Sequence, residues 1–204
     1  MAPTPPRPRP KTPSVPRPLA VALTGGIAAG KSEALASFAR HGAATASSDA
    51  IVHDLLAEDA EARAAIRGRW GEDAVDDRGR IGEIVFADPD ELEWLEQLLH
   101  PRVALAQRAW LDELAHRAAP PPLAVVEIPL LFETGGEERF DAVVVVTAPL
   151  ELREQRRGSF AAREARLVPE AEKVRRADFA YVNDGSLEEL DTFVAGVVES
   201  LSSS

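Results

Sequence analysis

The chain has 204 residues, no cysteine and a formal net charge of −11 at pH 7. This length suffices for one domain with a subdomain, and the lack of cysteine excludes disulfides, thiolate metal sites and a cysteine nucleophile. No apolar run approaches the roughly 20 residues of a membrane span, and the four histidines show no metal-ligand spacing. We therefore expect a soluble cytoplasmic protein without a membrane partner. Its acidic balance also disfavours nucleic acid as a partner.

Residues 1–18 differ in composition from the remainder of the chain. They contain eight prolines, three arginines and a lysine, and no acidic residue. Such a segment cannot form regular structure or a core, so we expect a disordered tail. A polyproline ligand for a partner domain is the alternative. Beyond the tail, 19 basic residues stand against 34 acidic ones, so positive charge for an anion site has to be concentrated locally.

A strand, a glycine-rich loop and a helix are predicted next. Residues 19–24 form an apolar run typical of a buried strand, and residues 32–40 are rich in helix formers. Between them, GGIAAGKS at 25–32 fits the phosphate-binding pattern G-x-x-x-x-G-K-[ST], rather than a chance glycine turn. In such a loop Lys31 can reach the β- and γ-phosphates and Ser32 can bind Mg²⁺. We expect a nucleoside triphosphate site formed by Gly26, Ala28, Ala29, Gly30, Lys31, Ser32 and Glu33.

A second predicted strand, at 43–47, is followed closely by Asp49. In a doubly wound sheet, ligands gather at the carboxyl ends of the strands. Asp49 is therefore a candidate to accept the proton from an attacking hydroxyl group. The alternative is an N-cap for the helix that starts at Ala50.

A long, mostly helical insert is expected at about 50–120. The run Asp88-Pro89-Asp90-Glu91 predicts a helix start, with the first aspartate as cap, the proline in the first turn and the glutamate completing a capping box. We expect His100-Pro101 to break this helix and a second helix to run to about Ala118. Two tryptophans of the insert are expected to pack rather than bind a ligand: Trp94 and Trp110.

Three further strands are predicted at 123–128, 142–147 and 179–182, followed by a helix at 187–200 and a serine tail at 201–204. Continuous apolar strands of this kind are buried on both faces, as in parallel sheets covered by helices. The expected fold class is therefore α/β, with a doubly wound parallel sheet of the P-loop NTPase type. Glu127 ends the third strand, where a carboxylate could orient Mg²⁺, and Thr147 ends the fourth.

The segment from Arg153 to Arg176 is basic, with eight basic residues against four glutamates. Phosphoryl transfer needs guanidinium groups over the transferring phosphate, and arginines from 153–163 can supply them. A solvated helix face is the alternative.

Several motifs resemble those of dephospho-coenzyme A (dephospho-CoA) kinases and occur in that family's order. They lie at 23–32, 48–52, 94–101, 128–133, 177–178 and 183–185. The resemblance implies a P-loop core, a helical substrate-binding insert and a lid at about 150–176. It also implies transfer of the γ-phosphate of ATP to the ribose 3′-hydroxyl of dephospho-CoA, with Mg²⁺, as the last step of coenzyme A synthesis. The roles that it implies are catalysis by Asp49, Lys31 and Arg157, and substrate contacts by His100, Pro129 and Leu130.

Two other functions stay open at this point. One is another small-molecule P-loop kinase of the nucleoside, shikimate or gluconate type, which a panel of acceptors would separate. The other is a nucleotide switch without enzymatic activity. Asp76-Asp77-Arg78-Gly79 spells the D-x-x-G pattern of such switches, but it lies in a polar turn and no N-K-x-D follows.

Overall fold

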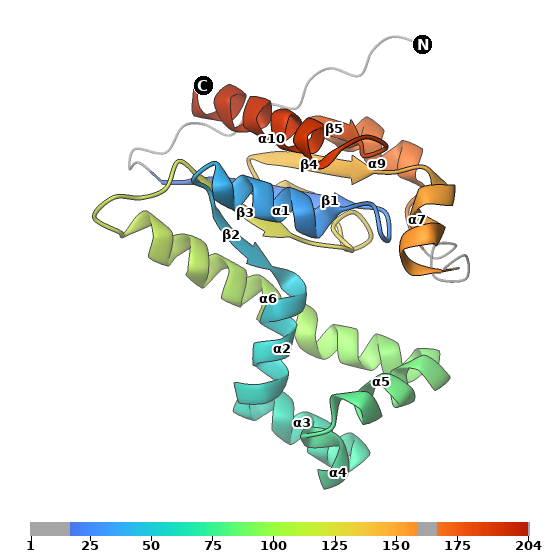
Figure 1. Cartoon of the computed structure of the whole chain (residues 1–204). Helices are drawn as coiled ribbons and strands as arrows, with labels where there is room; N and C mark the ends of the chain where they lie inside the picture. The colour runs from blue at the N-terminus through green and yellow to red at the C-terminus, as the bar shows by residue number, and fades with distance from the viewer. Residues whose placement is uncertain (1–16, 159–166, 204) are drawn as a thin grey trace. The chain divides into compact units, whose positions relative to one another are not determined.

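The computed structural model describes residues 17–158 and 167–203, in two compact units (Figure 1). The first unit comprises Met1–Thr45 and Glu113–Ser204, and the second comprises Ala46–Asp112. The second unit overlaps the insert that the sequence predicts at about 50–120, but it begins at Ala46 and ends at Asp112. In the part of the chain that the structure describes, no helix is both long and apolar enough to cross a membrane.

A five-stranded sheet in the order β2-β3-β1-β4-β5 forms the centre of the first unit. Its strands are β1 (Leu19–Gly25), β2 (Ala44–Ser47), β3 (Leu123–Glu127), β4 (Ala142–Thr147) and β5 (Phe179–Val182). β1 pairs in parallel with β3 and β4, and β4 pairs in parallel with β5. Every residue of β4 is buried, as expected for a strand covered on both faces. The five predicted strands are confirmed to within one residue at each end.

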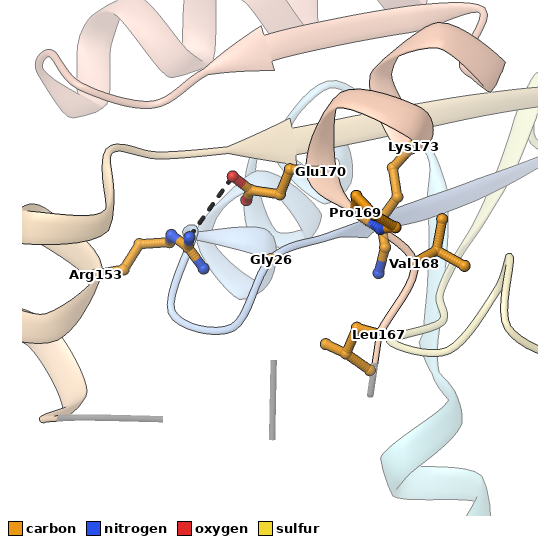
Figure 2. A pocket seen from close by; sticks show the side chains of 7 residues that line it. All are labelled: Gly26, Arg153, Leu167, Val168, Pro169, Glu170 and Lys173. Carbon is orange, nitrogen blue, oxygen red and sulfur yellow. Dashed lines mark ion pairs between the residues drawn. The ribbon is translucent and has the colours of Figure 1, made fainter. Parts of the chain in front are cut away.

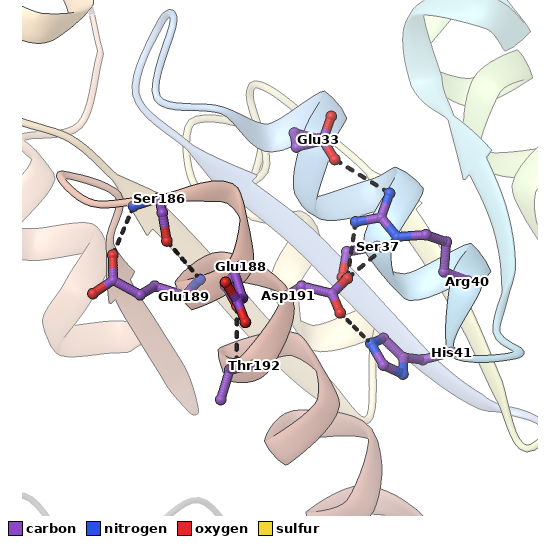
Figure 3. Close-up of polar contacts among 9 residues, drawn as sticks. All are labelled: Glu33, Ser37, Arg40, His41, Ser186, Glu188, Glu189, Asp191 and Thr192. Carbon is purple, nitrogen blue, oxygen red and sulfur yellow. Dashed lines mark hydrogen bonds and ion pairs between the residues drawn. The ribbon is translucent and has the colours of Figure 1, made fainter.

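The helices of this unit are α1 (Lys31–Arg40), η1 (Gly136–Arg139), α7 (Leu150–Arg157), α9 (Glu170–Arg176) and α10 (Leu187–Ser202). α1 and α10 contact each other and pack on the sheet, burying Phe38 and Leu190 completely. α10 starts with a capping box between Ser186 and Glu189 (Figure 3). The predicted end of this helix was too early: α10 continues to Ser202, because Leu201 packs against the core.

A cluster of polar side chains holds α1 against α10 (Figure 3). Asp191 on α10 accepts hydrogen bonds from Ser37 at 2.6 Å and Arg40 at 2.8 Å, and lies 3.1 Å from the ring of His41. The pKa of the Asp191 carboxyl lies well below its usual range. The hydrogen bond from the Ser37 hydroxyl has the largest effect, and Arg40 and His41 lower the pKa further. The cluster therefore fixes the helix whose N-terminus closes the glycine-rich loop.

The boundary of the predicted N-terminal tail was placed too late. Arg17 donates to both carboxylate oxygens of Asp141, at 2.7 and 2.8 Å, and this pairing raises the pKa of its guanidinium. Asp141 also accepts from the backbone N–H of Ala20, so it joins the incoming chain to the start of β1. The remainder of the predicted tail, residues 1–16, lies outside the described residues.

The second unit is helical, as predicted. It contains α2 (Ser48–Glu58), α3 (Ala60–Trp70), α4 (Glu72–Val75), α5 (Arg78–Ala87) and most of α6 (Pro89–Ala115). Its core includes Leu56, Ile66 and Leu95. Trp94 packs edge-on against Trp70 with ring centroids 4.9 Å apart, which confirms the packing role predicted for Trp94.

Two details of α6 differ from the prediction. The helix is continuous through Pro101, because one missing N–H removes only one backbone bond, and Arg102 donates a side-chain bond to the Leu98 carbonyl at 2.9 Å beside it. Asp88 caps the helix by accepting from the N–H of Asp90, but Glu91 forms no capping box. Its carboxylate instead accepts bonds from the side chains of Arg69 and Trp70.

Candidate active site

The glycine-rich loop joins the end of β1 to the start of α1 and requires unusual backbone angles. Gly25, Ala28 and Gly30 have φ values of 146°, 58° and 102°. A Cβ atom on Gly25 would lie 1.8 Å from the carbonyl oxygen of Val146 on β4, so only glycine fits there. The start of the loop therefore passes very close to the backbone of β4, and glycine makes this close approach possible.

Lys31 and Ser32 occupy the first turn of α1, where backbone N–H groups and the helix dipole favour an anion. The Lys31 ammonium group donates to the Gly26 carbonyl at 2.9 Å, which holds the side chain back along the loop. Ser32 is exposed, while Glu33 pairs with Arg40 at 3.2 Å. The predicted nucleotide-binding residues thus lie together in the loop and the first turn of α1.

Asn183 is a further residue of this loop's surroundings that the sequence did not assign. It follows β5, is buried, and donates from its amide to the Ala29 carbonyl at 2.8 Å. A Cβ atom on Gly30 would lie 2.2 Å from the same amide nitrogen. Its position directly after a predicted strand could have pointed to it, because ligands gather at the carboxyl ends of the strands.

Glu127 and Thr147 end the two strands that flank β1. Glu127 is half-buried and aligns with Leu23, which lies two residues before the loop. Thr147 is buried, and its hydroxyl donates to the Tyr181 carbonyl at 3.3 Å. This hydroxyl is therefore used in a bond to β5. Among residues 17–158 and 167–203 there is no group of three acidic or histidine side chains able to hold a metal by itself.

Two of the predicted arginines contact the loop. The Arg153 side chain is only 5% exposed and donates to the Ala148 carbonyl at 2.9 Å and to the Ile27 carbonyl at 3.5 Å. Arg156 donates to the Ala28 carbonyl at 3.2 Å. Arg157, the arginine predicted to be catalytic, is exposed at the end of α7. The predicted Arg163 lies outside the described residues.

A cavity of about 180 Å³ adjoins Gly26, and Figure 2 shows the side chains that line it. Arg153 and Glu170 face each other there with 3.6 Å between guanidinium nitrogen and carboxylate oxygen. Buried Lys173 pairs with Glu133 at 2.8 Å, and Glu133 also accepts from the Val168 N–H at 3.0 Å. The sequence assigned no role to Glu170. Its neighbours in the chain do not indicate that the first turn of α9 lies beside the glycine-rich loop.

The turn after β3 carries the predicted substrate residues Pro129 and Leu130, both half-buried. The Pro129 carbonyl lies 3.4 Å from the hydroxyl of Thr24 on β1. Further along the turn, Glu137 pairs with Arg176 of α9, whose guanidinium lies 4.5 Å from the centre of the Phe132 ring. These contacts dock α9, and with it Glu170, onto the turn.

The remaining predicted residues belong to the second unit. Asp49 is exposed in the first turn of α2, and the N-cap of that helix is Ser47, so the capping alternative for Asp49 was wrong. The preceding Ser48 is buried and accepts a bond from Gln107 of α6 at 3.0 Å. His100 is exposed on α6. Asp49 is therefore a solvent-accessible carboxylate on an anchored helical turn.

Comparison with known proteins shows which family this chain resembles. The family model described as dephospho-CoA kinase matches residues 19–189. A dephospho-CoA kinase of Rhodopseudomonas palustris (strain HaA2) is 41% identical over 79% of this chain and 84% of its own length. A dephospho-CoA kinase of Mesorhizobium japonicum is 39% identical over 90% of this chain and 96% of its own length. Among solved structures, a Thermus thermophilus protein has a TM-score of 0.72 and 33% identity, covering 91% of this chain and 99% of its own. The dephospho-CoA kinase of Campylobacter jejuni has a TM-score of 0.69 and 27% identity, covering 90% and 97%.

Proposed function

Because the chain belongs to the dephospho-CoA kinase family, we propose that it transfers the γ-phosphate of ATP to the ribose 3′-hydroxyl of dephospho-CoA. The products are coenzyme A and ADP, so the reaction completes coenzyme A synthesis, and we expect it to take place in the cytoplasm. The observation that carries the proposal is the family match over residues 19–189, which includes both the loop and the helical insert.

The loop binds the nucleotide in this proposal. Backbone N–H groups of residues 26–32 surround the β- and γ-phosphates, and Lys31 exchanges its bond to the Gly26 carbonyl for phosphate oxygen. Arg157, which is exposed on α7, contributes its guanidinium to the transferring phosphate. Arg153 and Arg156 support the loop through the carbonyls of Ile27 and Ala28.

Ser32 and Glu127 fit a magnesium site. A hydroxyl and a carboxylate are hard oxygen donors, which Mg²⁺ prefers. Ser32 lies in the first turn of α1 directly after the loop, and Glu127 ends β3, which pairs with the strand that leads into the loop. When bound, Mg²⁺ neutralises charge on the phosphates. Ser32 would ligate the ion directly, while Glu127 would orient it or its water ligands.

Asp49 acts on the acceptor in this proposal. Its exposed carboxylate accepts the proton that the ribose hydroxyl loses as the new P–O bond forms. The bond from Gln107 to Ser48 fixes the helical turn that carries it. His100, Pro129 and Leu130 are proposed to contact the acceptor.

The test is to incubate the protein with Mg²⁺, ATP and dephospho-CoA and to measure coenzyme A by mass. We expect a gain of one phosphoryl group on the acceptor, and adenosine, shikimate and gluconate to be poor acceptors. Lys31→Ala is the matched control. It removes the ammonium group that is proposed to offset the negative charge of the phosphates, while the side chain contributes little to the core. Absence of coenzyme A with the unaltered protein, or equal turnover by Lys31→Ala, would refute the proposal.

A further inference from the structure

Most arginines of the second unit have carboxylate partners. Ion pairs of this kind are formed by Arg63, Arg67, Arg69, Arg80 and Arg102. Arg78, at the start of α5, differs from them. Its guanidinium contacts the imidazole Nδ1 of His53 on α2, and within residues 17–158 and 167–203 it contacts no carboxylate. Its charge is therefore not neutralised by a direct ion pair.

The nearest acidic residues along the chain are engaged elsewhere. Asp77 caps α5 by accepting from the N–H of Arg80 at 3.0 Å, and Asp76 pairs with Arg63. Both Arg78 and His53 are exposed. The turn that carries the D-x-x-G pattern thus presents a cation to solvent on a chain with an overall charge of −11.

The chemistry of the pair defines what it can bind. A guanidinium group has only N–H donors, so the His53 Nδ1 atom must be the acceptor in this contact. The ring proton of the neutral imidazole then lies on Nε2, which is a donor as well. The pair therefore offers several N–H donors and one positive charge, which suits an anionic ligand with several oxygens.

The position of the pair relates it to the proposed catalytic carboxylate. His53 follows Asp49 by four residues on α2, so the two side chains lie on one face, about 6 Å apart along the helix axis. This spacing is comparable to the span of a ribose ring together with its 5′-phosphate group. An acceptor with its 3′-hydroxyl at Asp49 can therefore direct its 5′-diphosphate toward His53 and Arg78.

We propose that Arg78 and His53 form a binding site for the diphosphate group of the acceptor nucleotide. The inference rests on the proposed function, in which Asp49 receives the ribose hydroxyl. Arg78 supplies charge and a planar fork for two phosphate oxygens, while His53 adds the Nε2–H donor and orients the guanidinium.

The test compares Arg78→Ala with Arg80→Ala, which removes the same charge from the same helix but from an arginine paired with Glu83. Loss of a charge-assisted phosphate contact should raise the KM for dephospho-CoA about 10- to 100-fold in Arg78→Ala. The KM for ATP and the kcat should change less than about twofold. Arg80→Ala should leave all three constants near those of the unaltered protein.

Further variants keep the test decisive. His53→Ala should raise the same KM by a smaller factor, and Arg78→Lys should fall between Arg78→Ala and the unaltered protein, because it keeps the charge and loses the fork. Melting temperatures identify any variant that folds poorly, and Arg78→Gln then takes its place.

An unchanged KM for dephospho-CoA in Arg78→Ala, or an equal rise in Arg80→Ala, would overturn this inference while leaving the kinase activity intact. Failure of the unaltered protein to phosphorylate dephospho-CoA would instead overturn the proposed function, so the two failures are distinguishable.

Discussion

Arg153 should contribute mainly to the stability of the loop region, which distinguishes it from Arg157. Its buried guanidinium forms a bond of 2.9 Å to the Ala148 carbonyl and longer contacts to Ile27 and Glu170. A buried hydrogen bond from a charged donor contributes about 1.5–3 kcal/mol, and the two longer contacts add less. Arg153→Ala should therefore lower the free energy of unfolding by about 2–4 kcal/mol.

Thermal unfolding followed by calorimetry or circular dichroism measures this effect. For a protein of this size, 1 kcal/mol corresponds to about 2–4 °C, so we expect a fall of about 5–15 °C in melting temperature. Arg157→Ala is the matched control, because its exposed side chain should change stability by less than about 0.5 kcal/mol.

A double variant tests the physical cause. Removing Arg153 leaves the Glu170 carboxylate, with a side chain 31% exposed, without its cationic neighbour across the cavity. Arg153→Ala combined with Glu170→Gln should therefore be less destabilised than the sum of the two single changes. The reasoning is refuted if Arg153→Ala is as stable as Arg157→Ala, or if the two changes add without interaction. Kinase activity should show the reverse order, with Arg157→Ala losing turnover at unchanged stability.

Three other predictions concern separate parts of the chain. Asp49→Asn should lower kcat by at least about 100-fold while the dissociation constant of ATP stays within about twofold, since an amide is a poor proton acceptor; loss of ATP affinity at an unchanged rate would assign Asp49 another role. Asp191→Asn should lower the melting temperature at pH 7, because the pKa of the folded carboxyl lies below its value of about 3.9 in the unfolded chain. That difference should be full above about pH 4 and shrink as the pH falls further toward the folded pKa, and a constant difference down to pH 2 would contradict this. Deletion of residues 2–16 should leave the melting temperature and turnover unchanged, whereas deletion of 2–17 should lower the melting temperature through loss of the Arg17–Asp141 pair; equal melting temperatures for the two deletions would show that the pair contributes nothing.

Much of the fold and the nucleotide site could be predicted from local patterns. Apolar runs identified β1, β3 and β4, because a strand covered on both faces must be apolar along its whole length. β2 and β5 were predicted as well, although they are less buried. The loop at 25–32 was predictable because its backbone angles demand glycine, and because the phosphate-binding pattern sets the spacing of glycine, lysine and serine. The helical insert followed from its composition and helix-start signals.

Other features depend on partners far away in the chain, which no local pattern reveals. Glu91 was suited to a capping box, yet Arg69 and Trp70 from another helix take its oxygens. Likewise, Pro101 does not end α6, because a long helix anchored on both sides of it tolerates one missing bond.

Around the glycine-rich loop, too, some features follow from local sequence and others from contacts between distant parts of the chain. The sequence by itself determined the loop and the acidic and basic residues available to it. Only the tertiary structure decided that Asn183 holds Ala29, that Glu170 faces Arg153, and that Arg78 meets His53. The physical reason is that strand and loop signals arise from neighbouring residues, whereas side-chain pairing depends on which elements the folded backbone brings together.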